Sequence, residues 1–79
     1  MFPLTITTVD KKLFKGEVVS VTAPAQEGEV TILAHHAPFV STLTNGVITV
    51  REGKDVEPLL FDIEKGIIEV GGNFATILV

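Results

Sequence analysis

The sequence predicts an all-β fold, an antiparallel β-sandwich or flattened β-barrel of about eight to ten short strands. Eleven valines, seven isoleucines and nine threonines make up about a third of the 79 residues, and β-branched side chains favour strands over helices. Turn signals recur about every eight to twelve residues, and no window of helical length has a 3.6-residue apolar period. We therefore expect one domain over residues 1–79, with no second core.

The first three predicted strands depend on two-residue alternation of apolar and polar side chains. In the second of them, Val19, Val21 and Ala23 lie on one face. That strand is expected to end at Pro24, because proline cannot donate a ladder hydrogen bond. The predicted strands cover residues 4–8, 17–23 and 29–34, with a turn over residues 10–16, a loop over residues 25–28 and a closing segment over residues 35–38.

The dipeptide Asn45-Gly46 is the best local signal in the chain. Both residue types tolerate positive φ, as the type I′ turn of a two-residue hairpin requires. Such a turn would place Leu43 opposite Ile48, with both side chains directed to the core. The predicted hairpin joins strands over residues 39–44 and 47–52.

Three further strands are expected in the last third of the chain, and Pro58 stands at the start of the first, where a strand tolerates proline. Leu60 next to Phe61, and Ile67 next to Ile68, place apolar side chains on both faces of their strands. Part of the outer surface is therefore expected to be covered, either at a corner between sheets or by a partner. These strands cover residues 59–63, 67–70 and 74–78, with turns at residues 52–55, 64–66 and 71–73.

Composition argues against several classes of function. Six basic and ten acidic residues give a formal charge of −4, which disfavours binding to nucleic acid or anionic lipid. No run approaches the roughly 20 apolar residues of a membrane span, so no direct membrane insertion is expected. Without cysteine there is no thiolate metal site. His35 and His36 are consecutive on a predicted strand, and their side chains would point to opposite faces, away from any shared metal ion.

The sequence contains no recognisable catalytic motif. Glu27 and Glu29 could form a carboxylate pair, but no nucleophile motif accompanies them, so solvated loop charges are the favoured interpretation. Gly71 and Gly72 are not followed by a helix that could bind phosphate. We expect no catalytic residue, no metal and no cofactor, and therefore a binding or structural module that is not an enzyme.

Short motifs of glycine, acidic and apolar residues follow one another along the chain. They are Leu13-Phe14-Lys15-Gly16-Glu17-Val18, Val21-Thr22-Ala23-Pro24, Glu27-Gly28-Glu29, Ile32-Leu33, His36-Ala37-Pro38, Gly46-Val47-Ile48-Thr49-Val50, Gly66-Ile67-Ile68-Glu69-Val70 and Ala75-Thr76-Ile77-Leu78. In order and spacing they resemble the N-terminal β-sandwich domain of the epsilon subunit of rotary F-type ATP synthases, over essentially the whole chain. The chain departs from the family pattern at Thr31, where glycine is usual, at Ala34-His35, which replaces Pro-Gly, and at Asn45, which replaces proline.

The resemblance implies a non-catalytic rotor subunit of the central stalk, which couples proton- or sodium-driven rotation to ATP synthesis. It implies two partners, the gamma subunit and the c ring, at the cytoplasmic face of an energy-transducing membrane or its matrix or stromal equivalent. By position in the family motifs, the expected c-ring contacts are Glu27, Gly28, Glu29 and Thr31, with the greatest weight on Glu29. The expected gamma contacts are His36, Ala37, Pro38, Leu60 and Ile67.

The family normally continues into a C-terminal helical hairpin, and we expect this chain to lack that hairpin and to bind no ATP. One alternative stays open at this point. Outward-facing threonines such as Thr42 and Thr49 would also suit a free-standing β-sandwich that binds another protein or a glycan.

Overall fold

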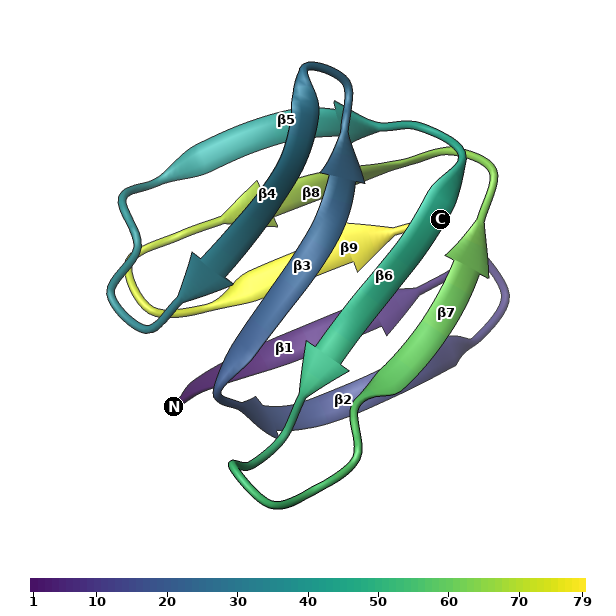
Figure 1. Cartoon of the computed structure of the whole chain (residues 1–79). Coiled ribbons are helices and arrows are strands. Elements are labelled where there is room, and N and C mark those ends of the chain that lie inside the picture. The colour runs from purple at the N-terminus through teal and green to yellow at the C-terminus, as the bar shows by residue number, and fades with distance from the viewer.

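Alternating side chains give most strands of this chain one buried and one exposed face, and this pattern builds two packed layers. The computed structural model describes all 79 residues and contains nine strands and no helix (Figure 1), so the all-β prediction is confirmed. No helix of the length and apolarity that a membrane span requires is present. The strands are β1 (Phe2–Thr7), β2 (Lys12–Val18), β3 (Ser20–Ala25), β4 (Gly28–Leu33), β5 (Phe39–Leu43), β6 (Gly46–Arg51), β7 (Leu59–Ile63), β8 (Gly66–Val70) and β9 (Ala75–Leu78).

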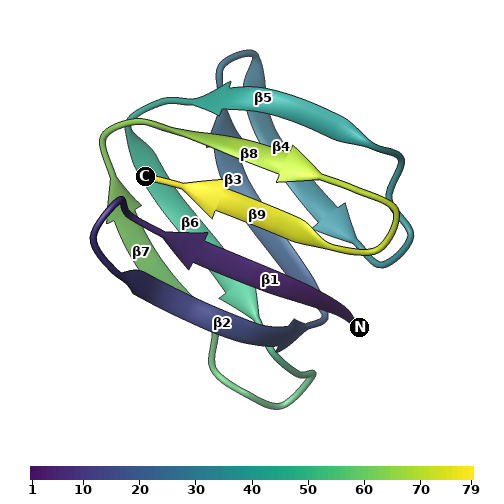
Figure 2. The ribbon, with the colours of Figure 1, turned by 180° about the vertical axis from the view of Figure 1, so that it is seen from behind.

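A single sheet folds over on itself to make both layers. Its strand order is β2-β1-β9-β8-β5-β3-β6-β7, and β4 pairs with β3 outside this path. Figure 1 places β4, β3, β6 and β7 in the layer nearer the viewer, called the front layer below. The back layer, seen directly in Figure 2, contains β5, β8, β9, β1 and β2. The layers are joined by one bridge, between Ala25 and Leu43. Every pairing is antiparallel except that of β1 with β9, which is parallel.

The core lies between the inner faces of the two layers. Sixteen hydrophobic side chains are buried there, from both layers. Leu43 and Ile48 are among them, 3% and 0% exposed, so their predicted placement in the core is confirmed. Phe14 of β2 packs edge-on against Phe61 of β7, with ring centroids 6.4 Å apart, and this contact covers the side where the two edge strands approach each other.

The prediction for residues 10–23 was wrong in its boundaries. Residues 13–16, expected in a turn, lie within β2, and Phe14, Lys15 and Gly16 pair with β1. The strand expected over residues 17–23 is divided at Val19, where the chain passes from the back layer to the front layer. Val18 and Val21 are fully buried whereas Val19 is 42% exposed, so Val19 does not share a face with Val21. The Val19 N–H donates to the carbonyl oxygen of Arg51 at 2.7 Å, which anchors the corner.

Pro24 also differs from expectation, because β3 continues through it to Ala25. The missing N–H removes no ladder bond to β4, because the main chain of Pro24 faces β5, where its carbonyl oxygen accepts a hydrogen bond from Thr44 N at 2.8 Å.

The Asn45-Gly46 hairpin does not exist. β5 pairs with β8, and β6 pairs with β3 and β7, but β5 and β6 do not pair with each other. Positive φ occurs only at His35 and Gly28, so neither residue of the dipeptide has the conformation of a type I′ turn. The segment is instead a corner between the layers. Gly46 meets a different requirement there, because a Cβ atom at this position would lie 2.9 Å from Pro24 Cβ.

Candidate functional site

The hairpin between β3 and β4 carries four of the predicted contact residues, Glu27, Gly28, Glu29 and Thr31, and all four are exposed. Ala25 pairs with Gly28, which leaves two residues in the loop. Gly28 has φ of 130°, a conformation that residues with a side chain rarely adopt.

A pair of contacts holds the hairpin tip against β5. Gln26 N donates to the carbonyl oxygen of Thr42 at 3.1 Å, and the Thr42 hydroxyl donates to Gln26 Oε1. The tip is therefore fixed to the back layer by both main-chain and side-chain hydrogen bonds, although it projects into solvent.

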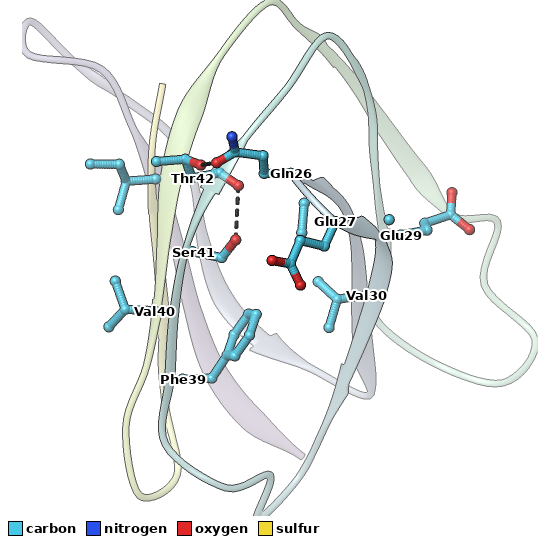
Figure 3. A pocket seen from close by; sticks show the side chains of 11 residues that line it. Gln26, Glu27, Glu29, Val30, Phe39, Val40, Ser41 and Thr42 are labelled. Carbon is cyan, nitrogen blue, oxygen red and sulfur yellow. Dashed lines mark hydrogen bonds between the residues drawn. The ribbon is translucent and has the colours of Figure 1, made fainter.

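A cleft of about 650 Å³ separates the hairpin from β5. In Figure 3, Glu27 and Val30 point into the cleft from the hairpin, and Phe39 and Ser41 face them from β5. Glu29 points away from the cleft, toward solvent. No lysine, arginine or histidine lines the cleft, so the Glu27 carboxylate is the charged group directed into it.

Thr31 lies on the outer face of the front layer, in a row set by strand register. It pairs with Thr22, Thr22 pairs with Thr49, and Thr49 pairs with Leu60. The hydroxyl oxygens of Thr22 and Thr31 are 2.9 Å apart and hydrogen-bonded. Thr42 belongs to β5 in the other layer, so Thr42 and Thr49 do not form one threonine-rich surface.

His36, Ala37 and Pro38 lie in the loop between β4 and β5. The preceding residue, His35, has φ of 63°, and its N–H donates to Asn73 Oδ1 at 3.4 Å. The two histidines therefore lie in a turn, and not on a strand as predicted. His36 Nδ1 is hydrogen-bonded to the Ala37 carbonyl oxygen at 2.7 Å, and its ring packs edge-on against that of Phe39. No cluster of three or more His, Cys, Asp or Glu side chains is placed to hold a metal ion.

An apolar patch lies on part of the outer face of the back layer, beside exposed Glu69. Ile67 pairs with Leu78 on the neighbouring strand, and both side chains are almost half exposed. Val40 is 69% exposed and Val9 is 90% exposed. A groove of about 410 Å³ is lined by Val9, Ile67 and Leu78 together with Thr42, Leu43, Lys65, Gly66 and Val79. Val9 was missed as a surface residue, because it falls between the strand expected over residues 4–8 and the turn expected over residues 10–16.

The structure divides the five predicted gamma contacts. The 36–38 loop leads into β5, whose outer face carries Val40 and adjoins Ile67 through the pairing of Thr42 with Ile67. Leu60 is 65% exposed on the outer face of the front layer, and the whole thickness of the domain separates it from Ile67. Ile67 instead lines the same cleft as Glu27 and Glu29.

Comparison with known proteins gives consistent matches to one family. The profile of one family, described as "ATP synthase, Delta/Epsilon chain, beta-sandwich domain", matches residues 1–79. The epsilon chain of Caulobacter vibrioides is 45% identical over 69 residues, which are 87% of this chain and 78% of that relative. The epsilon chain of Protochlamydia amoebophila is 41% identical over 78 residues, which are 99% of this chain but 52% of the relative. The chain thus spans about half the length of this second relative.

Two solved structures have the same fold. A chain of the Euglena gracilis mitochondrial ATP synthase, from an OSCP/F1/c-ring assembly, aligns with a TM-score of 0.87 and 28% identity, over 96% of this chain and 48% of that chain. A chain of the Tetrahymena thermophila mitochondrial ATP synthase, from a central stalk and c-ring structure, aligns with a TM-score of 0.82 over 98% of this chain and 61% of that chain. At 21% identity the second match supports the fold alone.

Proposed function

The chain belongs to the family of ATP synthase delta/epsilon chains and matches its β-sandwich domain, and from this premise we propose that it is a rotor part of the central stalk that links the gamma subunit to the c ring. The observation that carries the proposal is the family match along all of residues 1–79. The Euglena gracilis neighbour, which is 28% identical, comes from an assembly that contains the c ring. In this role the domain transmits torque and performs no chemistry, and it is held at the membrane peripherally, through the c ring.

The β3–β4 hairpin is suited to a contact with polar loops of the c ring. Glu27, Gly28 and Glu29 are exposed at its tip, and the hydrogen bonds of Gln26 to Thr42 keep the tip from swinging. A charged contact on a rigid support fixes orientation and partner choice more than it adds affinity. Glu29, which points into solvent in Figure 3, is the residue that we assign to this contact first. Thr31, on the same outer face, extends it.

The apolar patch on the outer face of the back layer is suited to gamma. Ile67, Leu78 and Val40 are neighbours across three strands, and Val9 overhangs the adjoining groove. Exposed apolar surface of this kind commonly marks a protein interface, and an anchor side chain in such a groove would supply much of the affinity. The 36–38 loop continues this surface at its far end. Leu60 would be reached only by a part of gamma that wraps the edge of the domain.

The c-ring assignment is tested by Glu29→Ala. Because Glu29 is exposed and makes no ion pair, the free energy of unfolding should change by less than about 0.5 kcal/mol. Capture of purified c ring by the domain should fall at least about fivefold, while capture of gamma stays unchanged. Glu57→Ala, an exposed carboxylate in the 52–58 loop, is the matched control. A large loss of stability, or unchanged c-ring capture, would contradict the assignment.

The gamma assignment is tested by Ile67→Asp, which places a charge in the apolar face. Capture of gamma should fall at least about tenfold while c-ring capture is retained, because desolvating an unpaired carboxylate in an interface is unfavourable. Val56→Asp is the control, since Val56 is similarly exposed, at 51% against 48%, but lies in a remote loop. Equal loss of gamma binding in both variants would show that the back-layer face is not the specific binding surface for gamma.

A further inference from the structure

One long edge of β4 has no partner strand. β4 pairs only with β3, and β5 crosses β3 at a single bridge next to the hairpin tip. The Pro24 carbonyl oxygen bonds to Thr44 N, so the main chain of Pro24 faces β5 and not β4. Its cross-strand partner Glu29 must then direct its N–H and C=O groups away from β3, and Thr31 does the same two residues later. These main-chain groups form an open ladder.

Two other edges of the sheet, those of β2 and β7, carry features that discourage pairing. β2 has three charged side chains, Lys12, Lys15 and Glu17. Its pairing with β1 also shifts register near its start, opposite Ile6 and Thr7. β7 has five residues, contains Asp62 and is preceded by Pro58. Charges, irregularities and proline are the usual means by which exposed edges avoid pairing with other chains. β4 has six residues, no proline, no lysine and one charge, and is less protected than β2 or β7. β5 also has an edge that is free apart from its bridge to β3.

The cleft beside this edge has the chemistry of a strand-binding site. Val30 and Phe39 are half-buried and form an apolar floor. Glu27 points in above them, with no cation among the lining residues (Figure 3). The site thus offers an open strand edge, an apolar floor and a carboxylate. A matching occupant would have free main-chain groups for the edge, an apolar side chain for the floor and a lysine or arginine for Glu27.

We propose that the β4 edge and its cleft capture an extended basic segment of a partner chain as an added strand. Main-chain hydrogen bonds to Glu29 and Thr31 supply the attachment, and the cleft selects the side chains. The added strand would bond to the main chain of Glu29 and Thr31, and the side chains of these two residues would not contact it. This capture goes beyond the proposed stalk function and does not depend on it.

The test uses the 79-residue chain labelled with ¹⁵N and a synthetic peptide, acetyl-Lys-Thr-Val-Thr-Val-Thr-Lys-amide. We expect saturable amide shifts along β4 at peptide concentrations up to about 1 mM, with slowed hydrogen exchange at Glu29 and Thr31. The control peptide, with glutamate in place of both lysines, should bind at least about fivefold more weakly. Shifts that lie outside β4 and the cleft, or equal binding of the two peptides, would overturn the proposal.

Two substitutions at one position separate main-chain from side-chain binding. Thr31→Pro removes the free N–H on the open edge without removing a bond to β3, and should abolish peptide binding. Thr31→Val removes the hydroxyl and keeps the N–H, and should bind like the unchanged chain. Glu27→Gln replaces an exposed loop side chain and should leave the fold unchanged. The lysine and glutamate peptides should then bind this variant with equal affinity. Retained binding in Thr31→Pro would overturn strand addition, and an undiminished preference in Glu27→Gln would overturn the role of the cleft.

Discussion

Two short connections at the same end of the domain are alike in length and opposite in outcome. Between β3 and β4 the chain reverses within one layer, and Ala25 pairs with Gly28. Between β5 and β6 an equally short connection passes from the back layer to the front, and the strands it joins find other partners. The two connections touch, since Thr44 N donates to the Pro24 carbonyl oxygen. The one with the stronger turn sequence, Asn45-Gly46, is the one that does not make a hairpin.

Their glycines show why the two connections differ. Gly28 has φ of 130° and nothing within 4 Å of an added Cβ atom, so glycine is required there by the backbone conformation. Gly46 has no positive φ, but an added Cβ would lie 2.9 Å from Pro24 Cβ, so glycine is required there to avoid a steric clash. A turn propensity is local, whereas a change of layer is decided by which side chains reach the core. Three substitutions separate these effects.

Gly46→Val should have the largest effect. Two branches at Cβ would overlap the Pro24 ring, which is held in β3 and cannot move aside, so we expect a loss of about 2 to 3 kcal/mol in the free energy of unfolding. Urea denaturation followed by circular dichroism measures it. Gly72→Val is the matched control, because an added Cβ there meets nothing within 4 Å. Equal losses in both variants would mean that the contact with Pro24 is not the cause.

Gly28→Ala should have an intermediate effect. The added methyl group meets no neighbour, but alanine at φ of 130° is strained, and the expected loss is about 1 to 2 kcal/mol. The hairpin tip should also become more mobile, which amide exchange at Gln26 would report. If Gly28→Ala were as stable as the unchanged chain, the hairpin would have to relax to another turn at no cost.

Asn45→Ala should have the smallest effect. In a type I′ turn the substitution would be unfavourable, because alanine resists positive φ. Asn45 has no positive φ and is exposed in a corner, so the change in stability should stay within about 0.5 kcal/mol. Thermal melting side by side with Gly28→Ala measures the contrast. A loss as large as that of Gly28→Ala would restore the hairpin interpretation.

Sequence patterns predicted the strands better than their partners. The strands of the C-terminal third, with Pro58 before β7 and glycines around β8, were placed within a residue or two because each is a short alternating run between turn residues. The corner at Val19 was missed, because alternation continues through it while the inward face changes. The pairing of β5 with β8 was missed for a related reason, since partners far apart in the chain are chosen by burial and not by the intervening turn.

The candidate surfaces were predictable in part. Exposure of Glu29, Leu60 and Ile67 followed from alternation and from paired apolar residues. Their separation onto different faces did not follow, because it depends on which layer each strand joins. The open edge of β4 could not be predicted from the sequence, since a strand with one neighbour has the same alternation of side chains as a strand with two.

The parallel pairing of β1 with β9 bears on how the chain acquires its structure. Leu4 aligns with Ala75, and Ile6 with Ile77, so the first and last strands are neighbours in the interior of the back layer. During synthesis β1 can pair with β2 as soon as both have emerged, but its other edge stays unpaired until β9 has been made. Closing so large a loop before any contact is gained slows folding, as is typical of β-proteins with mostly non-local contacts. The domain should therefore complete its fold only once β9 has been made and can pair with β1.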